Sequence, residues 1–206
     1  RCVHADATHG VLVLEHVAGT VWSRATARSA EGIDRIGAVF RELHSLAAPA
    51  GLPAVDARES IRRYLAVGVP GPVPRATLAD RAAAAVACYA PRLHAFCHHD
   101  VHHRNVVAAD RLVLLDWEYA GVGDPALDLA AFAAYHDLEA AARARLRAAY
   151  GPGVGHAELE RALCVFDCLQ ALWHDAAGTW HALAPGSRDA LVARVTGPRK
   201  APVDSR

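Results

Sequence analysis

The sequence predicts an α+β fold that is mainly helical, with a small β-hairpin near the centre of the chain. Long stretches repeat apolar residues every three or four positions, which is the spacing of one helix face. The short apolar run 112–115 follows a turn at 108–111 instead, and this pattern is typical of a strand. With 206 residues, of which 53% are hydrophobic and 21% charged, the chain can bury a substantial core.

The expected helices show this apolar spacing or a clear start signal. Asp124 can cap free backbone amides and Pro125 suits the first helical position, so a helix is expected from there through Phe132. The other helices are expected at Ser29–Ala47, Arg58–Ala66, Thr77–Tyr89, Leu138–Tyr150 and Leu159–Trp173. Gly68–Pro74 is expected to be a loop because it is dense in Gly and Pro.

Two β elements are expected. Val11–Val17 is an apolar, β-rich run that follows the turn pair His9-Gly10. The central hairpin would join Val106-Val107 to Leu112–Leu115. Its second strand is apolar throughout, so we expect it to be buried on both faces.

Charge and cysteine content exclude several classes of partner. Lys plus Arg and Asp plus Glu number 22 each, which leaves no basic excess for a nucleic acid. No apolar run approaches the roughly 20 residues that span a bilayer, so no membrane association is expected. The five cysteines form no C-x-x-C pair and are typical of reduced thiols in a cytoplasmic protein. Nothing in the sequence indicates an oligomeric state.

The segment most informative about chemistry is His98-x-Asp100-x4-Asn105, which Asp116 follows eleven residues after Asn105. Phosphoryl transfer from Mg-ATP needs a carboxylate for the acceptor hydroxyl and oxygen ligands for Mg²⁺. A loop of the form H-x-D-x4-N supplies the carboxylate and one ligand. An Asp at the end of the following hairpin supplies a second hard oxygen.

These residues, together with Asp116–Tyr119 and Gly123–Ala130, resemble the aminoglycoside phosphotransferase and choline kinase superfamily. The sequence Asp-Trp-Glu-Tyr at 116–119 is most similar to the thiamine kinase and bacterial choline kinase branch. The resemblance implies a protein-kinase-like fold, mainly its helical C-terminal lobe with a remnant of the N-lobe. Residues 1–19 would be the end of the N-lobe and the hinge, 20–196 the C-lobe with the catalytic loop, and 197–206 a disordered tail.

The resemblance also implies roles for single residues. It implies that Asp100 is the catalytic base and that Asn105 and Asp116 bind Mg²⁺. His98 and Asp128 would support the loop, although a plain surface charge remains an alternative for Asp128. Backbone groups at Glu15, His16 and Val17 would meet the adenine of ATP. Candidate substrate contacts are Trp117, Glu118 and Tyr119, because they follow the metal-binding Asp directly.

The implied function is an ATP- and Mg²⁺-dependent phosphotransferase that acts on a hydroxyl of a small, cationic molecule. Thiamine or choline is expected ahead of an aminoglycoside. The only lysine is Lys200, and no glycine-rich loop precedes Val11. The family's N-lobe contains both features, so the sequence is expected to be an N-terminally truncated piece that binds Mg-ATP weakly or is inactive alone.

Two alternatives from other classes stay open. One is a catalytically inactive kinase-like binding or regulatory module. The other is a metal-dependent hydrolase that uses the histidine cluster, in which His98 and His102 are four residues apart. The expected roles without chemistry are solvated loop residues for His99, His102 and His103, a buried small side chain for Cys97, and core positions for Trp173 and Trp180.

Overall fold

A computed structural model describes residues 2–67 and 71–197 of the chain. Positions 68–70 of the expected loop and 198–206 of the expected tail lie outside the described residues. The α-helices are α1 (Arg24–Arg28), α2 (Ala30–Ser45), α3 (Ala57–Val67), α4 (Arg75–Ala87), α5 (Pro125–Tyr135), α6 (Ala140–Tyr150), α7 (His156–Ala177) and α8 (Pro185–Thr196). The strands are β1 (Cys2–Asp6), β2 (Val11–Leu14), β3 (Thr20–Val21), β4 (Ala95–Cys97), β5 (Val106–Ala108), β6 (Leu112–Leu114) and β7 (Gly121–Gly123). Short 3-10 turns cover His103–Asn105 and Trp180–Ala182.

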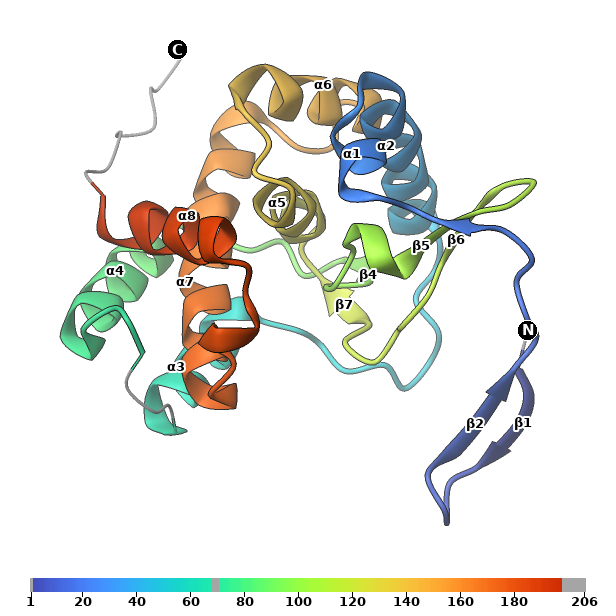
Figure 1. Ribbon diagram of the computed structural model, residues 1–206, viewed down its shortest axis with the longest axis horizontal. Helices are drawn as coiled ribbons and strands as arrows, with labels where there is room; N and C mark the ends of the chain where they lie inside the picture. Colours follow the sequence, from blue (N-terminus) through green and yellow to red (C-terminus); the bar gives the residue numbers. More distant parts are fainter. Residues whose placement is uncertain (1, 68–70, 198–206) are drawn as a thin grey trace.

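Helix α5 is the centre of the helical body. Figure 1 shows it surrounded by α2, α6 and α7, and it packs mainly against α7. Residues 125–134 of this helix are all buried, which agrees with an apolar composition on every side. Around this centre α2 packs on α6, while α3, α4 and α8 pack on α7.

The start of α5 has the predicted chemistry. Asp124 precedes the helix and its Oδ1 accepts a hydrogen bond from the backbone amide of Ala126 at 3.0 Å. Pro125 occupies the first turn, where a missing amide hydrogen costs nothing. The other carboxylate oxygen of Asp124 accepts a bond from the hydroxyl of Tyr89 at 2.7 Å. The helix start is therefore fixed in the core.

The central hairpin forms as predicted, and β3 extends it to three strands in the order β3-β5-β6. A separate antiparallel pair joins β4 to β7. The expectation that 112–115 is buried on both faces is wrong, because Leu112–Leu115 are only partly buried. The reason is the strand order, since β6 is an edge strand of a small sheet and β5 is its one neighbour there.

The N-terminal hairpin of β1 and β2 projects from the body, as Figure 1 shows. Its second strand ends at Leu14, so the prediction that it reaches Val17 is wrong. The register runs from Asp6↔Val11 to Cys2↔Leu14, and β1 begins at that last pair. All four residues of β2 are exposed. Among the described residues, no helix is long and apolar enough to cross a membrane.

Candidate active site

The loop after β4 is tied to the β6 end by His98. Its Nε2–H donates to the carbonyl oxygen of Leu115 at 2.8 Å, so Nδ1 is the acceptor for the backbone amide of Asp100 at 3.3 Å. The indole of Trp117 packs on the same imidazole, with ring centroids 4.5 Å apart. Because both ring nitrogens of His98 are engaged, the ring fixes the loop against the hairpin.

Asp128, in the first turn of α5, binds the backbone of the same loop. It is fully buried, and its two oxygens accept the backbone amides of His98 at 2.9 Å and His99 at 2.7 Å. The imidazole Nε2 of His44, from α2, lies 3.1 Å from Oδ2. Burial acts to raise the pKa of Asp128, but these hydrogen bonds and the facing imidazoles outweigh it and hold the pKa well below its usual range. A buried carboxylate therefore joins α2, α5 and the loop.

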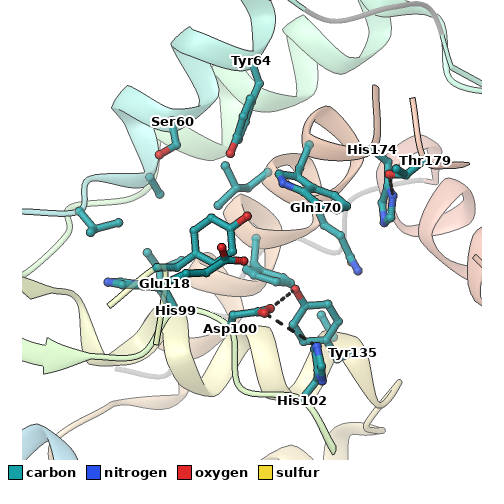
Figure 2. Close-up of a pocket in the computed structure, with 18 of the residues that line it drawn as sticks. Ser60, Tyr64, His99, Asp100, His102, Glu118, Tyr135, Gln170, His174 and Thr179 are labelled. Carbon is teal, nitrogen blue, oxygen red and sulfur yellow. Dashed lines mark hydrogen bonds and ion pairs between the residues drawn. The ribbon is translucent and has the colours of Figure 1, made fainter. Parts of the chain in front are cut away.

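Asp100 is largely enclosed and lines a cavity (Figure 2). The hydroxyl of Tyr135 donates to its Oδ1 at 2.8 Å. Nδ2 of Asn105 donates to its backbone oxygen at 3.0 Å and reaches Oδ2 at 3.3 Å. Burial raises the pKa of Asp100, and the hydrogen bond from Tyr135 and the nearby His102 oppose that effect. The arrangement supplies a carboxylate that can receive a proton from a group in the cavity.

Asn105 and Asp116 are brought together by the hairpin register. Val106 pairs with Leu114, and the amide of Leu115 donates to the carbonyl of Asn105 at 2.9 Å. Asp116 follows at once, with a φ of 65° that turns the chain out of the strand direction. The amide oxygen of Asn105 and the carboxylate of Asp116 are hard donors of the kind Mg²⁺ prefers, so this pair fits the metal.

The cavity beside Asp100 has a volume of about 1040 Å³. Its walls come from the loop that bears Asp100, from α3, α5, α7 and α8, and from the segment after Asp116, and Figure 2 shows part of this lining. The aromatic and polar groups on these walls include Tyr64, His102, Glu118, Tyr119, Gln170, Trp173 and His174. A cavity of this size and mixed lining can hold a small organic molecule.

The expected substrate contacts divide into two groups. Glu118 and Tyr119 line the cavity, whereas Trp117 does not and packs on His98 and Phe96 instead. Trp173 was expected in the core, and that expectation is wrong. It is 36% exposed and lines the cavity, because its position on α7 faces the gap toward α3. Trp180 is buried as expected.

The histidine cluster does not behave as a set of solvated loop residues. The side chain of His99 is only 9% exposed, and its ring packs so closely on Gly123 that a Cβ there would lie 2.4 Å from Nε2. The prediction of a solvated His99 is therefore wrong, since the loop turns it inward at a φ of 65°. His102 is partly exposed and lies in the loop rather than on a helix with His98. Cys97 is buried, as expected.

A zinc pair of His98 and His102 has no support in the part of the chain that the structure describes. Both nitrogens of His98 are used in hydrogen bonds. The group of side chains close enough to share an ion is His44, Cys97 and Asp128. In that group Asp128 already accepts three hydrogen bonds, and burial raises the pKa of the Cys97 thiol.

Glu15, His16 and Val17 follow β2 and lie outside the cavity. Glu15 and His16 are exposed and Val17 is half-buried. The adenine contact expected for this segment stays a prediction.

Tyr135 and His44 were not among the predicted site residues, although each had a signal in the sequence. Tyr135 is seven residues after Asp128, two helical turns along α5, so both side chains lie on one face. His44 is four residues after the buried Phe40, which places it on the inward face of α2. The polar residue on an apolar face was the clue in both cases.

A mainly helical lobe with a small central hairpin, and an aspartate loop that faces a cavity, are typical of a protein-kinase-like phosphotransferase. The chain belongs to the phosphotransferase enzyme family of aminoglycoside phosphotransferase type, whose profile matches residues 2–165. No curated protein sequence gives a significant match.

Solved structures support the same fold. A choline/ethanolamine kinase family protein from Mesorhizobium loti is 26% identical with a TM-score of 0.75, over 98% of this chain and 74% of that one. The choline kinase LicA from Streptococcus pneumoniae is 18% identical with a TM-score of 0.74, over 95% and 72%. The macrolide 2'-phosphotransferase MphH from Brachybacterium faecium is 20% identical with a TM-score of 0.62, over 95% and 73%. LicA has also been solved with AMP.

Proposed function

We propose that this protein transfers the γ-phosphoryl group of ATP to a hydroxyl of a small, cationic alcohol. The observation that carries the proposal is the position of Asp100. Its carboxylate is fixed by Tyr135 and Asn105 and faces a cavity of about 1040 Å³. The site supplies positioning and charge stabilisation, which are the main requirements of this reaction.

Asp100 is the proposed base. It would orient the acceptor hydroxyl and take its proton while the oxygen approaches phosphorus in line. The loop that bears it is held by His98 and Asp128, through buried hydrogen bonds of 2.7 to 2.9 Å to the backbone and to Leu115. A base on such a support keeps its geometry without reorganisation during the reaction.

Asn105 and Asp116 are the proposed Mg²⁺ ligands. When bound, Mg-ATP supplies the phosphoryl group, and its metal neutralises charge on the phosphates. The two residues offer the oxygens for this ion because the hairpin holds them in neighbouring registers. Residues 1–19 are proposed to be the end of the nucleotide lobe and the hinge, where backbone groups of Glu15, His16 and Val17 would meet adenine.

The cavity chemistry favours a cationic acceptor. Tyr119 and Trp173 present aromatic rings there, and Glu118 adds a carboxylate, whereas the ring of Tyr64 already has the guanidinium of Arg63 over it at 5.1 Å. A cation over such rings gains about 0.5 to 2 kcal/mol per contact, depending on how far it is desolvated. We therefore place a quaternary ammonium or thiazolium alcohol, of choline or thiamine type, ahead of an aminoglycoside.

The test is ADP release with Mg-ATP across thiamine, choline, ethanolamine and an aminoglycoside. A form that includes any coding sequence upstream of Arg1 is measured in parallel, because Lys200 is the only lysine here. Acceptor-dependent turnover is expected, and Asp100→Asn should lower kcat by about 10²- to 10⁴-fold.

The other outcomes separate the alternatives. Nucleotide binding without turnover on any alcohol would contradict the proposal and support an inactive binding module. Stoichiometric zinc in the purified protein, with hydrolase activity, would support the metal hydrolase instead. Equal turnover by wild type and Asp100→Asn would remove Asp100 from the role of base.

A further inference from the structure

A tyrosine outside the sequence motif lies against the proposed base. Tyr135, the last residue of α5, donates its hydroxyl hydrogen to Oδ1 of Asp100 at 2.8 Å. We propose that Tyr135 is a positioning residue that holds Oδ1, so that Oδ2 is the oxygen that takes the acceptor proton. This inference rests on the proposed function and names a second residue on which its chemistry depends.

The two oxygens of Asp100 have different surroundings. Oδ1 has a short hydrogen bond from a neutral hydroxyl. Oδ2 has only longer approaches, 3.3 Å from Nδ2 of Asn105 and 3.8 Å from Nε2 of His102. A carboxylate oxygen has room for two hydrogen-bond donors, so Oδ2 can accept a hydroxyl from the cavity beside its long bond from Asn105. Oδ1 is therefore the more firmly held of the two oxygens, and Oδ2 is the one more easily shared with an acceptor hydroxyl.

The Tyr135 hydroxyl is itself held in place. The rings of His102 and Phe166 pack edge-on against its ring, with centroids 5.3 and 5.4 Å away. Its backbone carbonyl accepts a bond at 2.6 Å from Arg24, whose guanidinium also pairs with Asp137. Burial, and then the neighbouring Asp100 carboxylate, raise the pKa of Tyr135 well above its usual value. The phenol therefore stays protonated and keeps the hydrogen that it donates to Asp100.

The role follows from the chemical step. As the acceptor oxygen bonds to the γ-phosphorus, its proton passes to Oδ2 of Asp100. The bond from phosphorus to the bridging oxygen breaks, and its electron pair leaves with ADP. The terminal torsion of an Asp side chain is broad, so a carboxylate without its partner can turn. A misplacement of about 1 Å at the reacting group can cost about 100-fold in rate.

The first experiment compares Tyr135→Phe with wild type. This change removes one oxygen and keeps the ring, and kcat is expected to fall about 10- to 100-fold while KM for ATP stays the same. In an Asp100→Asn background the same change should cause no further fall, because Tyr135 acts through Asp100. Turnover within twofold of wild type, or an equal fall in the Asp100→Asn background, would overturn the proposal.

Tyr89→Phe is the matched control. Tyr89 is also buried and also donates to an aspartate, Asp124, but it does not line the cavity. Its loss should lower stability and leave kcat unchanged. A fall in kcat as large as that of Tyr135→Phe would show that any lost tyrosine–aspartate bond slows the enzyme, which would overturn a specific role for Tyr135.

A second measurement does not need turnover. Crystal structures of wild type and Tyr135→Phe are expected to show one orientation of the Asp100 carboxylate in the first and more than one in the second. A single, unchanged orientation in the variant would overturn the proposal. If wild type phosphorylates no acceptor, the proposed function fails, and the two structures still decide whether Tyr135 positions Asp100.

Discussion

The two β-hairpins of this chain have similar apolar sequences and very different surroundings. In the N-terminal hairpin, Leu12 is 61% and Leu14 is 55% exposed, whereas in the central hairpin Val106 and Val107 are at most 4% exposed. The difference comes from partners outside the hairpin. In the central hairpin Val106 packs in the hydrophobic core, β3 pairs with β5, and Leu115 is bonded to His98 in the loop that bears Asp100, while β1 and β2 pair with each other. A run of apolar residues predicts a strand, but the elements that pack on the strand decide how far it is buried.

Removal of the buried Asp128 carboxylate, which holds the loop after β4, should lower the stability of the protein more than the other changes. Asp128→Ala leaves two backbone amides and the His44 ring without their acceptor, so the free energy of unfolding is expected to fall by about 3 kcal/mol or more. Urea denaturation measures this, with Asp189→Ala on the exposed start of α8 as the control. A loss below about 0.5 kcal/mol would mean that the loop is held by other contacts.

Acid should produce the next largest fall in the free energy of unfolding, through His136 at the end of α5. Burial lowers the pKa of His136 to about 3, while its carbonyl partner Phe132 opposes this only in part. The unfolded chain therefore binds more protons below pH 6.5, and His136 stabilises the fold above that pH and loses this contribution as pH falls toward 3. Between pH 7 and pH 5 the expected loss is about 2 kcal/mol. His136→Gln should flatten this part of the pH profile, and an unchanged slope would contradict the assignment.

A substitution in the cavity wall should change the affinity for the acceptor rather than the stability of the fold. Trp173→Leu removes an aromatic face from α7, so KM for a cationic acceptor is expected to rise about 3- to 30-fold, with little change in kcat. A neutral acceptor of similar shape gives the comparison, because it gains nothing from the ring quadrupole. Equal effects on both acceptors would show that Trp173 contributes only area.

The exposed hairpin should respond least. Leu12→Ser on β2 changes a side chain that is largely in solvent, so the free energy of unfolding is expected to change by less than about 0.5 kcal/mol. The matched change in the central hairpin, Val106→Ser, should cost several times more. A large loss at Leu12 would reveal a covering contact and would remove the contrast between the two hairpins.

Much of the fold could be predicted because its signals are local. The start of α5 follows from Asp124 and Pro125, and the expected helices on α2, α3, α4, α6 and α7 differ from the observed ones by a few residues at their ends. Besides β1 and α1, the elements that were not predicted had weaker signals. Strands β3, β4 and β7 have two or three residues each, and α8 begins after Ala184 without a side-chain cap.

In the site, too, features with a local sequence signal could be predicted and features made by tertiary packing could not. The spacing of His98, Asp100 and Asn105 indicated a catalytic loop, and the structure brings these residues together. The cavity could not be predicted, because α3 and α7 meet through tertiary packing that no local pattern encodes. Trp173 illustrates this, since the same helical stripe contains both core residues and a residue that faces the opening between two helices.

Asp128 and Tyr135 lie on one helix, two turns apart, and both contact the catalytic loop. The cavity wall also contains residues from other helices, among them α3 and α7. If the proposed function holds, changes in α3 and α7 would alter which molecule binds, while the contacts from α5 would keep Asp100 in one position. The residues of α3 and α7 that line the cavity could then vary between related proteins, while the residues of α5 that contact the loop would stay constant.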